Sequence, residues 1–162
     1  HSNYRMAPIN LFNEKTSTYT ALRQVLGEFH AAYALLFTRL TLTDCYHVGR
    51  AWGGYPSFAD GCDENILHAE TWHDIDAIIS FFRDEEGRKY AAIVNNTTTK
   101  NGQLALTVCK KAGRMVRAGA SGGSDVFYAH HDEGCTDHGE TFTYTPWLAP
   151  GQMNVYRFDP AE

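Results

Sequence analysis

The second half of the chain alternates apolar and polar residues in short runs separated by turn residues, and this rhythm constrains the fold most. The last run, 152–158, follows a Pro-Gly pair and stops at Asp159-Pro160. Short runs rich in Val, Phe and Tyr and bounded by Gly, Pro, Asn or Asp are typical of strands. We expect about eight of them, in the segments 42–48, 77–83, 90–95, 103–109, 114–117, 126–129, 141–144 and 152–158. Strands at such close spacing favour an antiparallel β-sandwich, so the predicted fold is mainly β.

A long amphipathic helix is expected ahead of the strands, from about Thr18 to Leu40. Apolar residues recur there at steps of three and four, the period of a helix with one apolar side. They form a stripe of Leu22, Val25, Leu26, Phe29, Tyr33, Leu36, Phe37 and Leu40. Another surface must cover such a broad stripe. The chain therefore divides into an irregular lead-in with this helix, residues 1–41, and a β-sandwich domain, residues 42–162, with a long loop at 49–76.

Two turn sequences are expected to introduce hairpin strands. Asp84-Glu85-Glu86-Gly87 separates the run 77–83 from the run 90–95, and its glycine can supply a positive φ. Asn101-Gly102 comes directly before the run 103–109. Asn-Gly is the strongest short hairpin signal, so we expect a tight turn there as well.

The chain is acidic, with a net charge of −5 and a pI of about 5.9. This balance excludes nucleic acid as a partner, since nucleic-acid binding needs a basic face. No apolar run approaches the ~20 residues needed to span a bilayer, so we expect no membrane partner. The chain starts at His1 without a signal-peptide pattern, which we interpret as an internal cut or a trimmed end. We expect no cofactor.

Cys45, Cys62, Cys109 and Cys135 are the four cysteines, and none belongs to a C-x-x-C pair. Four cysteines allow three disulfide connectivities, and the sequence does not choose among them. The alternative is four thiols that pack as small hydrophobic side chains.

The order of the expected helix, strands and turns along the chain resembles that of a known protein family. A helix leads into Asp44-Cys45-Tyr46-His47-Val48, a strand and acidic turn at 81–90 lead to Ile93-Val94-Asn95-Asn96-Thr97, and the chain closes on Leu148-Ala149-Pro150-Gly151-Gln152. Over residues 18–158 this resembles the C-terminal part of TIM-barrel glycoside hydrolases of the β-galactosidase-like kind. In that family a last barrel-side helix runs into a β-sandwich.

The resemblance implies a non-catalytic C-terminal module of a glycoside-hydrolase-like protein. It places a catalytic barrel before this chain, and it implies that the helix docks on that barrel or on a second subunit. Family catalytic carboxylates sit on barrel strands, so we assign no catalytic residue and leave open whether this chain is itself an enzyme. The resemblance also favours a secreted or periplasmic location.

A carbohydrate-binding module is the first alternative. Trp52, Tyr55, Trp72 and Trp147, with Phe58, could form a platform for sugar rings, because Trp and Tyr offer a flat apolar face with a polar edge. The opposing interpretation is that these rings plug the ends of the sandwich.

A small metal-dependent enzyme is the second alternative. His130, His131, Asp132, Cys135 and His138 lie in one short segment, and imidazole, carboxylate and thiolate all bind transition metals. Their spacing matches no standard zinc pattern, and a solvated polar loop explains the same residues.

Two further patterns are noted. Carboxylates and histidines gather between Asp60 and Asp76, where a carboxylate pair could act on a glycosidic bond if it lay about 5–9.5 Å apart. A charged loop that faces water is the other interpretation.

Asn95 and Asn96 begin two overlapping glycosylation sequons, which a polar turn also explains.

Overall fold

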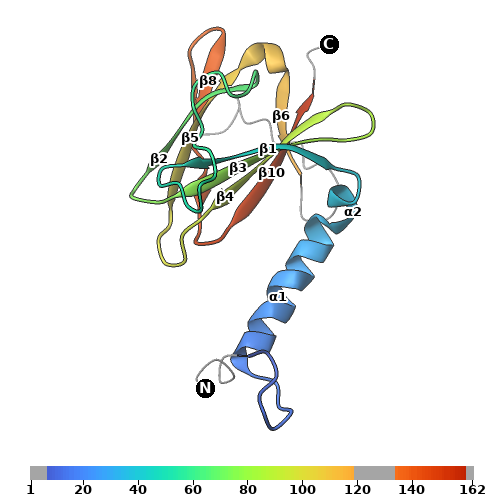
Figure 1. The fold of residues 1–162 in the computed structure, drawn as a ribbon. Helices are drawn as coiled ribbons and strands as arrows, with labels where there is room; N and C mark the ends of the chain where they lie inside the picture. The colour runs from blue at the N-terminus through green and yellow to red at the C-terminus, as the bar shows by residue number, and fades with distance from the viewer. Residues whose placement is uncertain (1–6, 119–133, 160–162) are drawn as a thin grey trace. The chain divides into compact units, whose positions relative to one another are not determined.

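The structure, a computed structural model, describes residues 7–118 and 134–159 (Figure 1). The chain forms two compact units, of which the smaller contains the chain through Thr38 and the larger begins at Arg39. The smaller unit holds the helices α1 (Ser17–Ala32) and α2 (Ala34–Phe37), and the strands belong to the larger unit. Among the residues that the structure describes, no helix is long and apolar enough to cross a bilayer.

The expected long helix before the strands is confirmed as α1, but its predicted end at Leu40 is wrong, because the helix is interrupted at Tyr33. Tyr33 has φ −133°, outside the helical region, although its N–H still bonds to the carbonyl of Phe29. Residues eight positions apart in a straight helix are separated by about 12 Å along the axis. The rings of Phe29 and Phe37 nevertheless lie 5.5 Å apart between centroids. Packing of these two rings therefore requires the bend at Tyr33.

The larger unit is built from two antiparallel sheets, which confirms the predicted β-sandwich fold. The first sheet has the order β1-β3-β4-β10-β6, and the second has the order β2-β5-β8-β7 with β9 beside β5. A short 3₁₀ turn at Lys110–Ala112 separates β5 from β6. The strands are β1 (Thr41–Val48), β2 (Ile66–Trp72), β3 (Ala77–Arg83), β4 (Lys89–Asn95), β5 (Gly102–Cys109), β6 (Arg114–Arg117), β7 (Cys135–Asp137), β8 (Thr141–Tyr144), β9 (Trp147–Leu148) and β10 (Met153–Asp159).

The hydrophobic core lies between the two sheets. Leu104 and Leu106 of β5 are completely buried in it, so Gln103 and Ala105, which alternate with them, lie on the outer face of the second sheet. The hydroxyls of Tyr144 and Tyr156 meet inside the core at 3.2 Å. Other core side chains are Ile66, Ile79, Phe81, Ile93, Val108, Phe142, Leu148 and Phe158.

The prediction of an irregular loop at 49–76 is wrong in its second half, because β2 lies there. A bulge between Ile66 and His68 shifts the register of β2 against β5 by one residue. As a result Ile66 and Ala69 both lie on the core side, although an odd spacing separates them. The bulge breaks the two-residue period from which a strand is predicted. The strands β7 and β9 were also not predicted, and the expected strand 126–129 lies outside the described residues.

The expected hairpin turn at Asn101-Gly102 is also wrong. The strand β4 before it belongs to the first sheet and β5 after it belongs to the second, so this segment crosses between sheets. Gly102 is buried and does not have a positive φ. The glycine is needed for another reason: a Cβ at Gly102 would lie 2.7 Å from the carbonyl oxygen of Trp72 and 2.7 Å from Cγ2 of Ile75.

None of the three disulfide connectivities is formed, since Cys45, Cys62 and Cys109 are free thiols. Cys45 accepts a hydrogen bond from the hydroxyl of Ser80 at 3.4 Å, and the thiol of Cys62 accepts one from the N–H of Ala59 at 3.4 Å. These cysteines therefore take part in the packing as single side chains.

The expected turn between β3 and β4 is confirmed and is organised by Asp84, whose side chain is 5% exposed. Its carboxylate accepts hydrogen bonds from Arg88 Nε at 2.6 Å and from the hydroxyl of Tyr90 at 3.0 Å, besides the backbone N–H groups of Glu86 and Arg88. Burial by itself raises the pKa of Asp84, but the hydrogen bonds from Arg88 and Tyr90 together outweigh it and lower the pKa below its ordinary value.

Asp84→Asn is expected to lower the free energy of unfolding at pH 7 by about 1–3 kcal/mol, because it removes charge-assisted hydrogen bonds from a buried site. A carboxyl with a depressed pKa in the folded state stabilises the protein above its unfolded pKa of about 3.9, and this stability is lost as pH falls through the folded pKa. The difference between wild type and variant should therefore shrink in urea titrations at pH 3. Glu85→Gln on the exposed neighbour is the control, and an equal loss there would contradict the role of Asp84.

Candidate functional site

Two exposed tryptophans and a glutamine form one row across the outer face of the second sheet. Trp72 of β2 pairs with Gln103 of β5, and Gln103 pairs on its other side with Trp147 of β9. Side chains at paired positions point to the same face, and Gln103 lies on the outer one. Trp72 is 41% exposed and Trp147 is 56% exposed. Both indoles are thus presented to solvent from the rigid frame of the sheet.

The turn after Trp72 brings a third ring into this row. His73 stacks on Trp147, with ring centroids 4.9 Å apart and planes inclined by 19°. His73 has φ +64° and Asp74 has φ +61°. Residues other than glycine adopt this left-handed region at a cost of about 1–3 kcal/mol each, and such strain collects at functional sites. The strained turn therefore marks this end of the sheet as a candidate site.

Hydrogen bonds fix the polar groups around the row. The indole N–H of Trp72 donates to Oε1 of Glu70 at 2.8 Å. Oε1 of Gln103 lies 3.2 Å from Nε2 of His73, and the amide nitrogen of Gln103 donates to the carbonyl of Thr145 at 3.2 Å. Glu70 and His73 are exposed, so their polar groups are within reach of a ligand. We define the indole face as Glu70, Trp72, His73, Gln103 and Trp147.

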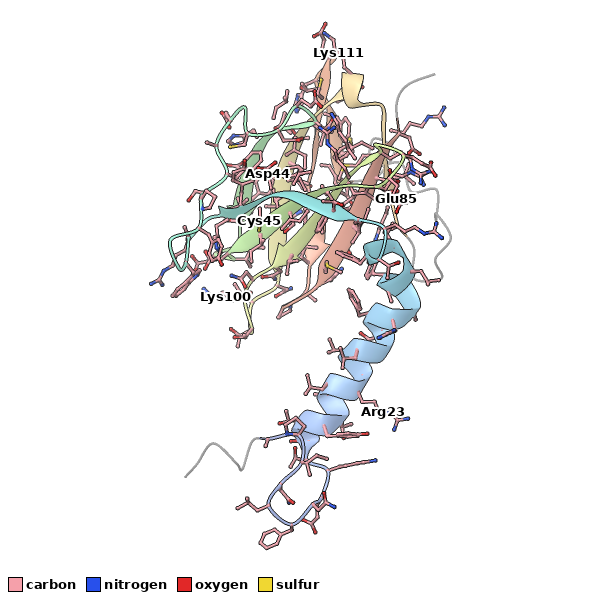
Figure 2. The ribbon with its side chains drawn as sticks, turned by 45° about the vertical axis from the view of Figure 1, so that its right-hand side comes forward. Arg23, Asp44, Cys45, Glu85, Lys100 and Lys111 are labelled. Atoms are coloured by element: carbon pink, nitrogen blue, oxygen red, sulfur yellow. The ribbon has the colours of Figure 1, made fainter. Side chains whose placement is uncertain are left out.

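An ion pair borders the indole face. Nζ of Lys100 lies 2.5 Å from Oδ2 of Asp74, and this hydrogen bond and charge lower the pKa of the Asp74 carboxyl. Both side chains are exposed to solvent. Lys100 lies in the segment between β4 and β5 (Figure 2). The pair links this segment to the strained turn.

The four predicted platform residues come from different elements of the chain. Trp72 and Trp147 share the row, whereas Trp52 and Tyr55 belong to the loop after β1. The guanidinium of Arg50 lies 4.0 Å from the Trp52 ring centroid, and the Tyr55 ring lies 6.2 Å from that of His47. Phe58 is half-buried and packs against the core.

The predicted metal-ligating set is only partly within the described residues. His130, His131 and Asp132 lie outside them, while Cys135 begins β7 and packs against the core. Nε2 of His138 lies 3.1 Å from the hydroxyl of Thr143. Across residues 7–118 and 134–159, no three His, Cys, Asp or Glu side chains gather as a metal site would require.

The carboxylates between Asp60 and Asp76 have separate structural roles. Asp63 accepts hydrogen bonds from the backbone N–H groups of Asn65 and Ile66 at 2.8 Å each. Asp76 accepts one from the N–H of Arg50 at 2.9 Å. Asp60 contacts Nδ1 of His68 at 2.7 Å. These contacts stabilise loops, and we assign no acid–base pair to this segment.

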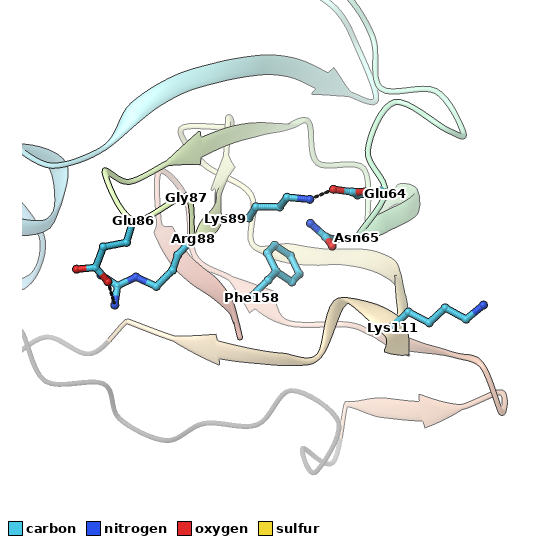
Figure 3. Close-up of a pocket in the computed structure, with 8 residues that line it drawn as sticks. All are labelled: Glu64, Asn65, Glu86, Gly87, Arg88, Lys89, Lys111 and Phe158. Carbon is cyan, nitrogen blue, oxygen red and sulfur yellow. Dashed lines mark ion pairs between the residues drawn. The ribbon is translucent and has the colours of Figure 1, made fainter. Parts of the chain in front are cut away.

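A pocket of about 380 Å³ opens near the turn between β3 and β4 (Figure 3). Phe158 contributes an apolar wall, and four of the five charged lining residues form two ion pairs, with Lys111 as the fifth. Lys89 forms an ion pair with Glu64, and Nη1 of Arg88 lies 3.0 Å from Oε2 of Glu86. Since each of these carboxylates is held by a cation, we assign the pocket no acid–base chemistry.

Comparisons with protein-family models, with curated proteins and with solved structures found no match. No single stretch of sequence contains the indole face, since its residues come from β2, the turn after it, β5 and β9. In the sequence, the tryptophans were the only sign of this site.

Proposed function

We propose that this chain is a non-catalytic β-sandwich module of a glycoside-hydrolase-like protein, attached to the catalytic unit of that protein through the apolar stripe of α1. A second subunit was the other expected occupant of the stripe. We choose the catalytic unit because the order of helix, acidic turn and closing Pro-Gly turn resembles a module that follows a barrel.

The exposed stripe of α1 is the observation that carries this proposal. Leu22 is 45% exposed, Val25 is 61% exposed and Leu26 is 55% exposed, and no residue of α1 is buried. Arg23, Gln24 and Glu28 lie off the stripe, and Arg23 projects from one side of the helix (Figure 2). Covering one Val or Leu side chain contributes about 1.5–3 kcal/mol. A helix with such a stripe is strongly favoured to bind an apolar surface.

The character of the sandwich supports a non-catalytic role. In the part of the chain that the structure describes, the candidate carboxylates are committed to backbone caps and ion pairs. The aromatic side chains at the ends of the sheets lie on a rigid, well-packed frame. A frame of this kind suits support and binding, and chemistry would come from the unit to which it is attached.

Leu22→Glu combined with Val25→Glu is expected to abolish attachment. The test is association between residues 1–162 and the separately expressed remainder of the gene product, followed by gel filtration and calorimetry. Loss of two buried apolar side chains and gain of two desolvated charges should raise the dissociation constant at least about a hundredfold.

The matched control is Thr20→Glu, because Thr20 is exposed on the opposite side of α1 from Leu22. It adds one carboxylate, where the double variant adds two, near the helix N-terminus, where a carboxylate is tolerated, and it should leave the affinity unchanged. Failure of the wild-type chain to associate, or association of the double variant with wild-type affinity, would refute the proposed attachment.

A further inference from the structure

The indole face combines features that together suit a sugar chain. We propose that it is a carbohydrate-binding site for a neutral, pyranose-containing oligosaccharide, with Trp72 and Trp147 as the stacking surfaces. This activity goes beyond the proposed attachment of the module and does not rest on it. The attachment uses the helix α1, whereas the sugar site uses the second sheet.

The spacing of the two indoles fits a chain of sugar rings. Neighbouring strands lie about 4.8 Å apart, so Trp72 and Trp147, with β5 between them, are separated by roughly 10 Å between backbones. The C–H face of a pyranose ring is apolar and packs on the apolar face of an indole. Two non-adjacent rings of one oligosaccharide can thus contact the two tryptophans.

Hydrogen-bonding groups lie beside both indoles. The Glu70 carboxylate accepts from the Trp72 indole through Oε1, and its second oxygen can accept from a sugar hydroxyl. The His73 imidazole, which stacks on Trp147, can donate or accept at the opposite end of the row. Aromatic side chains together with a few fixed polar groups are the usual composition of a small-ligand site.

The remainder of the outer face is also lined by polar side chains. His68, Thr107, Thr143 and Thr136 pair in sequence across β2, β5, β8 and β7, which places their side chains on the same face as the indoles. Between this row and the indoles lies Ala105, the smallest side chain of the face. A surface of hydroxyls and imidazole is suited to a polyhydroxylated ligand, whereas a protein-docking core is apolar.

The indole face is held in its arrangement before any ligand binds. Gln103 joins the turn after β2 to the segment before β9, because its side chain contacts both His73 and Thr145. The left-handed conformations of His73 and Asp74 are retained despite their cost. Preorganisation of this kind reduces the entropy lost on binding. The Glu70 carboxylate disfavours an anionic polysaccharide, while the charge of Asp74 is compensated by Lys100, so the ligand is assigned as neutral.

The test is affinity electrophoresis in native gels that contain hydroxyethylcellulose, xylan, galactomannan or the anionic control polygalacturonate. We expect at least one neutral polysaccharide to retard the wild-type chain and polygalacturonate to leave it unretarded. Trp72→Ala and Trp147→Ala should each weaken binding about tenfold or more, as loss of a central aromatic contact does. Leu22→Glu with Val25→Glu should bind as wild type, which separates this site from the helix stripe.

Trp52→Ala is the matched control, because Trp52 is 49% exposed but lies outside the row. It should keep wild-type binding. Thermal melting checks each variant, and Trp72→Tyr and Trp147→Tyr retain a stacking ring and should keep part of the affinity if an alanine variant is unstable. Absence of retardation in all three neutral gels would overturn the proposal. Wild-type binding by both the alanine and tyrosine variants, or an equal loss in Trp52→Ala, would also overturn it.

Discussion

Asn95→Asp is expected to lower the free energy of unfolding by about 3–5 kcal/mol, because it places an unpaired charge at a completely buried position. The Asn95 amide donates to the carbonyls of Lys100 at 2.8 Å and Leu148 at 3.1 Å. Its oxygen accepts from the N–H of Thr97 at 3.0 Å and from the Thr97 hydroxyl at 2.7 Å. Aspartate retains the two acceptor contacts but cannot donate, so two carbonyl groups would face a carboxylate.

Asn95 has this effect because it connects segments that are distant in the sequence. Besides its side-chain contacts, its backbone carbonyl accepts from the N–H of Gly151 at 3.1 Å, and its N–H donates to the carbonyl of Gln152 at 3.0 Å. One residue therefore joins the end of β4 to the turn before β10. The same burial removes Asn95 as a glycosylation acceptor, whereas Asn96, the acceptor of the second sequon, is exposed.

Urea denaturation at pH 7 measures this effect, and Asn96→Asp is the matched control. It makes the identical chemical change one residue further along, on an exposed side chain. Its effect should stay within about 0.5 kcal/mol of wild type. If Asn95→Asp unfolded within 1 kcal/mol of wild type, the proposed role of the amide as a connector would be wrong.

Three strands, β3, β6 and β8, have the predicted bounds. In β3 and β8 the core side and the outer side alternate without interruption, which is the pattern from which a strand is predicted. β2 was missed because its bulge changes the period and because its outward positions are His, Glu and Trp. β9 is only two residues long and pairs with part of β5, so it carries too little pattern to be recognised.

The candidate site was less accessible from the sequence than the fold. The tryptophans were recognised as a set, but only strand register decides which of them share a face. Trp72, Gln103 and Trp147 are brought together by two pairings with β5, and nothing in the local sequence of any of them encodes those pairings. The position of His73 was also not predictable from the sequence. Its stack on Trp147 depends on a left-handed backbone conformation that the residue type does not predict.

Gly102→Ala is expected to lower the free energy of unfolding by about 1–3 kcal/mol, as overpacking in a close-packed interior does. The new Cβ would meet the Trp72 carbonyl oxygen and Ile75 Cγ2, both at 2.7 Å. The carbonyl belongs to the backbone of β2, so relief requires β2 or the turn after it to move away from β5. Because Trp72 is the last residue of β2, this movement should also disturb its pairing with Gln103.

The two consequences of Gly102→Ala can be measured separately. Urea denaturation measures the loss of stability. The NMR resonances of the backbone amides and indole N–H groups of Trp72 and Trp147 report whether the row is disturbed. Gly27→Ala is the control, because nothing lies within 4 Å of a Cβ there and the site is helical. That variant should be unchanged or more stable by up to about 1 kcal/mol. If Gly102→Ala matched wild type in stability and left the Trp72 and Trp147 resonances in place, the close approach of β5 to Trp72 would not be what requires glycine at this position.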